Sequence, residues 1–328
     1  MLRFIQRPET DPYYNLAAEE YLLKTAQVDT FMTWRNEPSV IIGKHQNALK
    51  EIDQSYIEKN NLPVIRRISG GGTVYHDPGN VNFTFIFTNR KENLIDFIEF
   101  TRPVILFLQN LGLDASFSGK NNITIEGLKV SGNSAHLYKN KVLYHGTLLF
   151  DSDLDILDRA IAGHEELFND KAVRSIRSKV TNIRGLLAND ISTEDFISQF
   201  KKFIFHYYKD IYEDKLDESD EAEIKKMVEA KYHSYQWNYG YSPDYEFNNR
   251  WINNGDEYSV SLKVTDGIIR EAELSGPETV SAFLKIIARV MIGSYHERDS
   301  IKKIIKHPFI NGKNDEHIMN QITVHLFR

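Results

Sequence analysis

The chain has 328 residues, of which 41% are hydrophobic and 26% are charged, and this composition is ordinary for a soluble globular protein with a sizeable core. Its formal net charge of −6 argues against general nucleic-acid binding, which needs a basic surface, although a local basic site remains compatible with it. The chain has no cysteine, so disulfides, thiolate metal sites and cysteine nucleophiles are excluded.

The N-terminal stretch "MLRFIQRPETDPYYN" is interrupted by charge and proline, so it does not resemble a signal peptide. Apolar runs such as "FTFIF" and "SVII" are too short to span a bilayer. We therefore expect a cytoplasmic protein that acts as a monomer, without a membrane or nucleic-acid partner.

The first half of the chain shows helix and strand periodicities in alternation. The predicted elements are a helix at about 15–26 with Asp11 and Pro12 just upstream, strands at 30–34 and 39–43, extended pieces at 63–68 and 73–77, and a strand at 82–88. A further helix is predicted at 94–112, where Gly112 stops it and Pro103 either starts or kinks it.

The second half begins with three β-rich runs at 121–150, separated by the turn pairs Glu126-Gly127 and Lys139-Asn140. The remaining predictions are helices at 193–212 and 217–232, an ordered connector at 232–258, a hairpin around Asp266-Gly267, and helices at 278–293 and 298–307. These patterns predict an α+β protein with a large domain to about residue 245 and a small α+β domain from about residue 256.

The segment "RRISGGGTVYHDPGN", residues 66–80, places three consecutive glycines after two arginines. Its spacing matches neither common phosphate-binding glycine motif. Three glycines still allow backbone N–H groups to turn toward one anion, and two guanidinium groups can bind phosphate or carboxylate. A glycine-rich hairpin with both arginines directed to solvent explains the composition equally well, so both interpretations stay open at this point.

The longer segment "RRISGGGTVYHDPGNVNFT" closely resembles the signature segment of lipoate–protein ligases. Four further segments resemble that family in the same order: "WRNEPSVIIGKHQN", "GLKVSGNSAHLYKNKVLYHGTLLFD", "SIRSKVTNI" and "WNYG". The similarity spans residues 10–245, and the combination is far more specific than the glycine run alone. It implies an α+β fold with a large mixed-sheet catalytic domain of the biotin/lipoate ligase type at 1–245, and a linker with a small α+β accessory domain at 246–328.

The resemblance implies an enzyme that activates free lipoate with ATP, and with Mg²⁺, to lipoyl-AMP. It then transfers the lipoyl group to a lysine of a carrier, which would be the lipoyl domains of 2-oxoacid dehydrogenase E2 subunits and the glycine cleavage H protein. Negative charge develops in both steps, so positioned cations and N–H donors are the expected catalytic groups. By resemblance the catalytic cation is Lys129, although without the family match a lysine there would be taken for a solvated strand residue.

The family pattern also assigns binding residues. ATP or lipoyl-AMP would contact Arg67, Gly72, Thr73, Val74, Tyr75, Asn80, Asn82 and Lys129. Lipoate would contact Arg66, Ser69, Gly70, Gly71, His76 and His145. The loop that closes over the adenylate would contribute Ser175, Arg177 and Val180. Thr73 stands where alanine is usual in the family, which adds one hydroxyl without much volume.

Three assignments keep an alternative. His76 and Asp77 could act as acid and base, or their hydrogen bonds could simply fix the loop. His145 could line the lipoyl tunnel or be a satisfied core histidine. Asn80 and Asn82 could anchor the loop or reach the adenylate.

One departure from the family concerns Gly119-Lys120-Asn121-Asn122, where the family often has Asn-Asp after a Gly-Arg pair. Asn122 lacks the carboxylate that a hard cation prefers, so the Mg²⁺ ligands remain unassigned apart from a candidate region around this residue. A lipoyl-AMP-dependent transferase that lacks efficient activation therefore stays open.

Other members of the fold class are separated by sequence. Octanoyltransferases act through a cysteine, which is missing here, and the Gly-Arg-Gly-Arg-x-Gly loop of biotin–protein ligases is absent. A non-enzymatic lipoate-binding or carrier-docking module also remains. The family's small domain is thought to swing between the half-reactions, and residues 239–251 are the hinge candidate.

Overall fold

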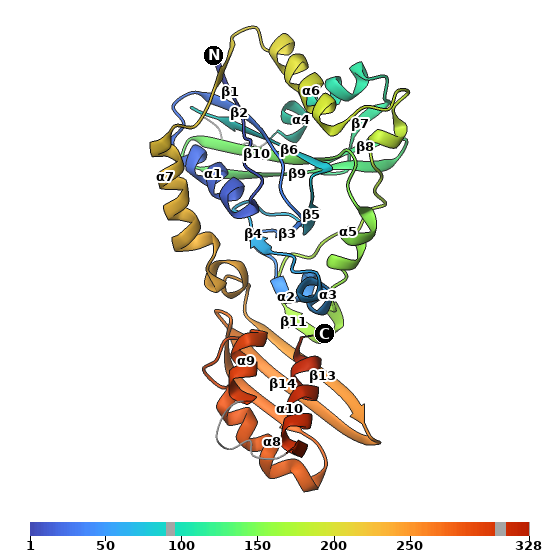
Figure 1. Cartoon of the computed structure of the whole chain (residues 1–328), viewed down its shortest axis with the longest axis vertical. Helices are drawn as coiled ribbons and strands as arrows, with labels where there is room; N and C mark the ends of the chain where they lie inside the picture. The colour runs from blue at the N-terminus through green and yellow to red at the C-terminus, as the bar shows by residue number, and fades with distance from the viewer. Residues whose placement is uncertain (90–95, 306–312, 328) are drawn as a thin grey trace. The chain divides into compact units, whose positions relative to one another are not determined.

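The computed structural model describes residues 1–89, 96–305 and 313–327 (Figure 1). The chain divides into two compact units, and neither is continuous in sequence. Unit 1 contains Met1–Lys44, Pro63–Asp158 and Ser175–Ser234, and unit 2 contains His45–Leu62, Arg159–Arg174 and Tyr235–Arg328. The domain limits predicted from sequence differ from these units because residues 45–62, 159–174 and 235–245 all belong to unit 2. As functional domains, 1–245 and 246–328 stay a prediction.

Unit 1 is built on an eight-stranded mixed sheet in the order β12-β1-β2-β6-β10-β9-β8-β7 (Figure 1). Its strands are β1 (Leu2–Gln6), β2 (Asp29–Trp34), β6 (Asn80–Phe87), β7 (Ala115–Ser118), β8 (Asn122–Ile125), β9 (Leu128–Tyr138), β10 (Lys141–Leu149) and β12 (Ile211–Asp214). Strand β1 is parallel to β12 and β2, and the other pairs are antiparallel. A three-stranded sheet, β4-β3-β5, is formed by β3 (Ser39–Ile42), β4 (Val64–Arg66) and β5 (Val74–His76).

Strand β6 shows why the large sheet has two different faces. Its sequence "NVNFTFIF" alternates, and successive side chains of a strand point to opposite faces. Val81, Phe83 and Phe85 enter the main hydrophobic cluster, together with apolar residues of helices α4 (Phe97–Asn110) and α6 (Thr193–Tyr207). Asn80, Asn82 and Thr84 therefore lie on the opposite face, where polar groups are available for function.

Helix α1 (Pro12–Thr25) packs on this polar face, where Glu19 accepts a hydrogen bond from Thr84 of β6. Asp11 caps the helix by accepting from the N–H groups of its first turn, and Pro12 occupies the first helical position, where no N–H is needed. The helix consequently begins earlier than predicted. Its last residue is Thr25, close to the predicted end.

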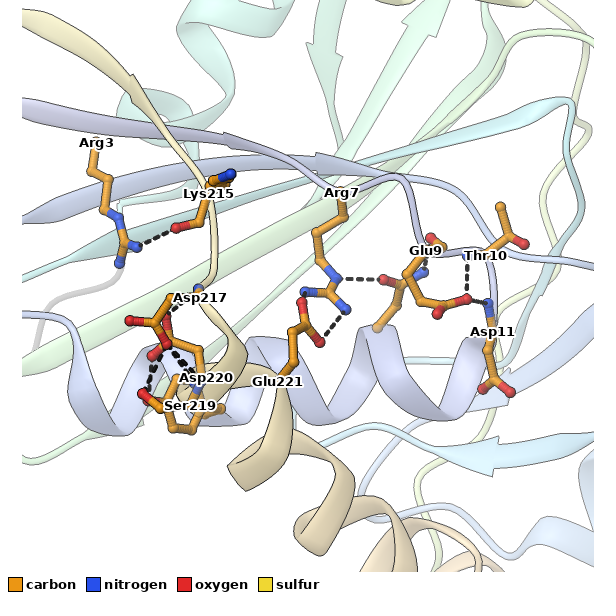
Figure 2. Close-up of polar contacts among 12 residues, drawn as sticks. Arg3, Arg7, Glu9, Thr10, Asp11, Lys215, Asp217, Ser219, Asp220 and Glu221 are labelled. Carbon is orange, nitrogen blue, oxygen red and sulfur yellow. Dashed lines mark hydrogen bonds and ion pairs between the residues drawn. The ribbon is translucent and has the colours of Figure 1, made fainter.

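Helix α7 (Glu218–Met227) lies beside α1, and Arg7, the residue that follows β1, forms an ion pair with it. Figure 2 shows Arg7 with both terminal nitrogens directed at the Glu221 carboxylate, at 2.8 and 3.3 Å. Arg7 Nε donates to Asn15 of α1 at 2.9 Å. Asp217 and Asp220 form a capping box at the start of α7 (Figure 2), so this helix is fixed at its N-terminus and along its side.

Unit 2 contains a four-stranded antiparallel sheet in the order β11-β13-β14-β15. Its strands are β11 (Phe168–Asp170), β13 (Tyr245–Asn253), β14 (Asp256–Thr265) and β15 (Ile268–Ser275), and its helices are α2 (Ala48–Glu51), α3 (Gln54–Lys59), α8 (Glu278–Met291), α9 (Arg298–Ile305) and α10 (Lys313–Leu326). The predicted hairpin turn is confirmed: Asp266 and Gly267 both have positive φ, at 53° and 73°.

The two segments that unit 2 takes from before residue 175 are joined by a buried ion pair. Lys50 Nζ lies 3.1 Å from Asp170 Oδ1, and both side chains are almost fully buried. Asn47 donates to the other oxygen of Asp170 at 3.0 Å. The remaining short elements are α5 (Leu154–Ala160) and single turns at Glu165–Leu167 and Arg184–Leu186.

The α+β class with a large mixed sheet, predicted from sequence, is confirmed, while several boundaries are corrected. The helix predicted at 193–212 ends at Tyr207, and its last residues instead form β12, which pairs in parallel with β1. The predicted connector at 232–258 contains β13, so much of the hinge candidate is regular strand. Two π-helical turns, Val228–Tyr232 and Gln236–Gly240, precede it, and α10 was not predicted.

Helix α4 begins at Phe97, before Pro103, so this proline lies inside the helix and does not start it. Residues 94–95 and 306–307 of two predicted helices fall outside the described residues. Within the described part of the chain, no helix combines the length and apolar character needed to cross a membrane.

Candidate active site

The glycine run between β4 and β5 is joined to strand β9 and to the segment after residue 174, all within unit 1. Ser134 of β9 donates its hydroxyl to the Gly70 carbonyl at 2.9 Å. Ser175 accepts the N–H of Thr73 at 3.0 Å, and a Cβ on Gly72 would lie 3.0 Å from its hydroxyl oxygen. The structure therefore brings together residues from all three predicted groups.

Arg67 is only 6% exposed and is directed into the glycine run. Its Nη2 donates to the carbonyls of Gly70 at 2.6 Å and Gly72 at 2.7 Å, and its Nη1 donates to Ile41 at 3.2 Å. Burial lowers the pKa of Arg67 to about 10, and the Glu19 carboxylate acts in the opposite direction. Arg67 thus orders the glycine run by donating to the carbonyl oxygens of that run.

Arg66 is fully buried and donates through Nη1 to the carbonyls of Gly43 and Lys44, at 3.0 Å each. These contacts hold the end of β3 against the start of the glycine run. The interpretation in which both arginines point to solvent is therefore wrong. A buried guanidinium requires such acceptors, because a charge that leaves water without partners is strongly unfavourable.

The three glycines differ in their surroundings. Gly71 has φ of +88°, a conformation that other residues rarely adopt, and a Cβ there would lie 3.0 Å from Arg67 Nη2. A Cβ on Gly70 would meet no heavy atom within 4 Å. Glycine at position 71 is thus explained by the fold itself, whereas position 70 is not.

Lys129 follows the β8–β9 turn at an irregularity in the strand register. The segment that contains the predicted adenylate loop pairs with it: the Lys129 N–H donates to Lys179 O, and the Thr181 N–H donates to Lys129 O, both at 3.0 Å. Its side chain is largely buried, with Nζ close to Gly132. Burial lowers the pKa of Lys129, and the nearby Arg67 guanidinium lowers it further.

His76 and Asp77 have partners that fix the loop. His76 Nδ1 accepts from the Asn36 amide at 3.0 Å. Burial lowers the pKa of His76 to about 3, with Arg67 and His145 contributing, so this imidazole is neutral near pH 7. Asp77 accepts the N–H groups of Gly79 at 3.0 Å and Asp153 at 2.7 Å. These contacts favour the loop-fixing interpretation of both residues over acid–base roles.

His145 of β10 stands in a buried hydrogen-bonded row. Its Nδ1 lies 2.8 Å from Glu19 Oε1, and its Nε2 lies 2.6 Å from Ser69 Oγ. Sequence reasoning missed Glu19. The available signal was its position three residues after Leu16 and four before Leu23, which places a carboxylate on an apolar helix face.

Asn80 and Asn82 are both buried on the polar face of β6. The Asn80 amide donates to Asn82 Oδ1 at 2.9 Å. Among the residues that the structure describes, Asn80 Oδ1 and Asn82 Nδ2 are buried without a hydrogen-bond partner. Tyr75 and Val74 pair with β3 in the small sheet, so the glycine run is followed at once by regular strand.

The predicted adenylate loop is exposed except where it meets β9 and the glycines. Arg177 is exposed, and Val180 forms an isolated parallel bridge with Lys129. Asn122 begins β8 opposite Gly132 of β9. In the described ranges, no group of three or more His, Cys, Asp or Glu side chains could hold a metal ion.

Comparison with known proteins gives the family. The family profile described as "Lipoyl protein ligase A/B catalytic domain" matches residues 11–205. The chain is 36% identical to lipoate-protein ligase LplJ of Bacillus subtilis over 317 residues, which covers 95% of this chain and 94% of the relative. It is also 36% identical to lipoate–protein ligase 1 of Staphylococcus aureus over 298 residues, which covers 90% of each chain.

Solved structures with a similar fold include members of the same family. Protein Ta0514 of Thermoplasma acidophilum, solved with bound lipoic acid, is 26% identical with a TM-score of 0.60 and covers 73% of this chain and 98% of its own. A lipoate-protein ligase A bound with ATP is 25% identical, with the same TM-score and coverage. A bi-partite ligase of T. acidophilum, studied with its E2 lipoyl domain, is 25% identical with a TM-score of 0.61, covering 73% and 96%. The chain belongs to the lipoate–protein ligase A/B family.

Proposed function

We propose that this protein activates free lipoate with ATP to give lipoyl-AMP and then transfers the lipoyl group to a lysine of a carrier domain. The observation that carries the proposal is the convergence of Lys129 with the glycine run and the segment 175–181. A single ammonium at this place can offset negative charge in both steps, and two hydrogen bonds with residues 179 and 181 hold the Lys129 main chain.

In the first step a carboxylate oxygen of lipoate forms a bond to the α-phosphorus of ATP, and the bond from that phosphorus to pyrophosphate breaks. The two reacting groups are both anionic, so a cation between them lowers their repulsion. Lys129 supplies that charge in this proposal. The polar face of β6 supports nucleotide binding, because Asn80 and Asn82 retain buried amide groups that a ligand can pair.

In the second step the neutral amine of the carrier lysine attacks the acyl carbon, the bond from that carbon to AMP oxygen breaks, and the amine loses a proton as the amide forms. Lys129 again faces the oxygen atoms that gain charge. The glycine run is ordered by Arg67 and Ser134, so its position is fixed before ligand arrives. Preorganisation of this kind avoids reorganisation during reaction.

Mg²⁺ enters this scheme as part of the MgATP substrate. Magnesium usually keeps waters and substrate phosphates as ligands and needs few protein carboxylates. Binding as MgATP is therefore compatible with an asparagine, in place of a carboxylate, at position 122. The proposed carriers are the lipoyl domains of 2-oxoacid dehydrogenase E2 subunits and the glycine cleavage H protein, supported by the relative studied with an E2 lipoyl domain. Because the proposed reaction consumes ATP, we place the protein in the cytoplasm in this proposal.

ATP–pyrophosphate exchange in the presence of free lipoate tests the proposal directly. Lipoate-dependent exchange, followed by amide formation on an added lipoyl domain, is the expected result. Transfer from supplied lipoyl-AMP without exchange would instead identify a transferase, which the change at Asn122 keeps open. If neither exchange nor transfer is observed, the protein is a lipoate-binding or carrier-docking module.

The residue-level prediction concerns Lys129→Ala, which should lower both exchange and transfer by at least about 100-fold, because it removes the charge that both steps use. Lys139→Asn is the matched control. It removes an exposed ammonium at the far end of β9, where φ of 53° suits asparagine. Circular dichroism should show both variants folded. Transfer at the wild-type rate by Lys129→Ala would refute the assignment.

A further inference from the structure

Four buried side chains form a continuous hydrogen-bonded row from helix α1 to the glycine run. Glu19 accepts from His145 Nδ1, at 2.8 Å to Oε1 and 3.1 Å to Oε2. His145 Nε2 lies 2.6 Å from Ser69 Oγ, and Arg67 Nε donates to that same oxygen at 3.1 Å. None of the four is more than 7% exposed.

The direction of each hydrogen bond in this row is determined by chemistry. An ionised carboxylate can only accept, so His145 carries its hydrogen on Nδ1. In the neutral imidazole, Nε2 then accepts the hydroxyl hydrogen of Ser69. The Ser69 oxygen has a lone pair directed to Arg67, because Arg67 can only donate. Glu19 is itself fixed by Thr84, whose hydroxyl donates to Oε1 at 2.6 Å while accepting from Trp34.

The row ends at the group that orders the glycine run, since Arg67 Nη2 holds the carbonyls of Gly70 and Gly72. We propose that Glu19 is a positioning residue which, through the His145 tautomer and the Ser69 hydroxyl, sets the orientation of Arg67 and so of the glycine run that receives the acyl-adenylate. The inference rests on the proposed function for the identity of that ligand, but the row itself is independent of it.

The order Glu–His–Ser is also that of a hydrolase triad, and the geometry distinguishes the two roles. A serine nucleophile must be accessible and must direct a free lone pair at its substrate. Ser69 is 0% exposed, and its oxygen already accepts from Arg67. The row therefore positions the loop and does not form a covalent intermediate.

The first experiment reads the tautomer. Two-dimensional NMR of the whole protein labelled with ¹⁵N-histidine distinguishes hydrogen on Nδ1 from hydrogen on Nε2. For His145 the expected wild-type state is Nδ1–H. In Glu19→Ala the acceptor of that hydrogen is removed, so the population should shift toward Nε2–H. In Glu19→Gln, Thr84 holds the amide oxygen at the Oε1 position, 2.8 Å from Nδ1, so Nδ1–H keeps an acceptor and the shift should be smaller. A wild-type His145 with hydrogen on Nε2 would overturn the proposal.

The second experiment measures coupling by a double-mutant cycle with Glu19→Ala and Ser69→Ala. Each variant should weaken lipoyl-AMP binding, measured by calorimetry, by about 10- to 100-fold. This is the loss expected when one hydrogen bond in a row that ends on a charged group is removed. Because His145 lies between the two residues in the row, a relay predicts that the double variant loses no more than the weaker-binding single variant. Losses that multiply would overturn the relay, and so would wild-type binding by both single variants.

Glu20→Ala is the matched control, because Glu20 is the next residue of α1 but pairs with Lys24, Lys231 and Tyr232. It should lower the melting temperature while leaving the His145 tautomer and the affinity for lipoyl-AMP unchanged. A fluorophosphonate probe that labels Ser69 would show an accessible nucleophile and overturn the positioning role. The tautomer and cycle do not depend on ATP activation, so failure of pyrophosphate exchange leaves them informative.

Discussion

At the scale of single residues, the three cations Arg66, Arg67 and Lys129 show that burial and partners decide what a charge does. Both guanidinium groups donate to at least two backbone carbonyls, which suits a planar group with several donors. Lys129 carries a compact ammonium whose pKa is lowered by burial and by Arg67. The arginines therefore build the site, and the lysine is the cation that remains suited to chemistry.

The glycine run offers a residue-scale prediction in which neighbouring positions behave differently. Gly71→Ala should cost about 1–2 kcal/mol of folding stability, because φ of +88° is unfavourable for alanine and the Cβ crowds Arg67. Gly70→Ala should change stability by less than about 0.5 kcal/mol, because its Cβ meets open space. Denaturant titration measures both.

Ligand binding gives the complementary readout for this pair. If lipoyl-AMP lies against the backbone at position 70, the added methyl group should weaken its binding by about tenfold while the fold is intact. Wild-type affinity in Gly70→Ala, measured by calorimetry, would mean that the ligand approaches another part of the loop.

At the scale of secondary-structure elements, helix α7 is fixed to the rest of unit 1 mainly by polar contacts. Arg7 is almost fully buried, and Glu221 neutralises it from α7 (Figure 2). Tyr21 of α1 adds a hydrogen bond of 2.6 Å to Asp220. The helix is mostly charged, with Ile224 as its buried apolar residue. Its position therefore depends on partners that lie far away in sequence.

This dependence predicts different costs for two glutamates on one helix. Glu221→Ala leaves the buried Arg7 guanidinium with Asn15 as its hydrogen-bond partner among the described residues, and it should lower the free energy of unfolding by about 1–3 kcal/mol. Glu223→Ala removes an exposed pair with Lys226 and should cost less than about 0.5 kcal/mol. Urea unfolding followed by circular dichroism compares them, and equal costs would contradict the role given to Arg7.

At the scale of the whole molecule, each unit has its own core and a buried histidine whose pKa is strongly lowered. Burial lowers the pKa of His76 in unit 1 to about 3, with a contribution from Arg67 and His145, and burial lowers the pKa of His296 in unit 2 to about 3. The ordinary value is 6.5, so between pH 3 and 6.5 the unfolded chain binds more protons than the folded one.

Stability should therefore fall as pH falls below about 6.5 and should recover above it. Between pH 7 and pH 5 each histidine should remove about 2 kcal/mol from the free energy of unfolding of its unit, since each pKa unit corresponds to about 1.4 kcal/mol. His76→Gln and His296→Gln should each flatten that dependence for one unit only. Chemical unfolding at several pH values, with separate probes for the two units, measures it. An unchanged pH dependence in both variants would contradict the assignment.

Much of the fold was predictable because turns and helix ends depend on residues that are neighbours in the sequence. The Glu126-Gly127 and Asp266-Gly267 turns were found because both residues of each pair adopt positive φ, which favours glycine and the residues tolerated beside it. Strand β12 was missed because "DIYED" follows an amphipathic helix without a break, and only pairing with β1 makes it a strand. Strand β13 was missed because its polar residues suggested a loop, although they alternate with buried aromatic ones.

The candidate site was predictable where its residues are consecutive in the sequence. Lys129, the glycine run and residues 175–180 were assigned to the candidate site by motif. Glu19 and Trp34 were not assigned roles, because their partners His145 and Thr84 are far away in sequence and are brought near by sheet register.

The sequence by itself determined the family, the turns, the alternating polar and apolar faces of β6 and the identity of the candidate catalytic lysine, because each of these depends on residues close together along the chain. Only the tertiary structure decided that Arg66 and Arg67 are buried scaffolding, that Glu19 joins the site, and that residues 45–62 and 159–174 belong to unit 2. The physical reason is that burial and hydrogen-bond partnership arise between segments distant in sequence, and no local pattern encodes which of them meet.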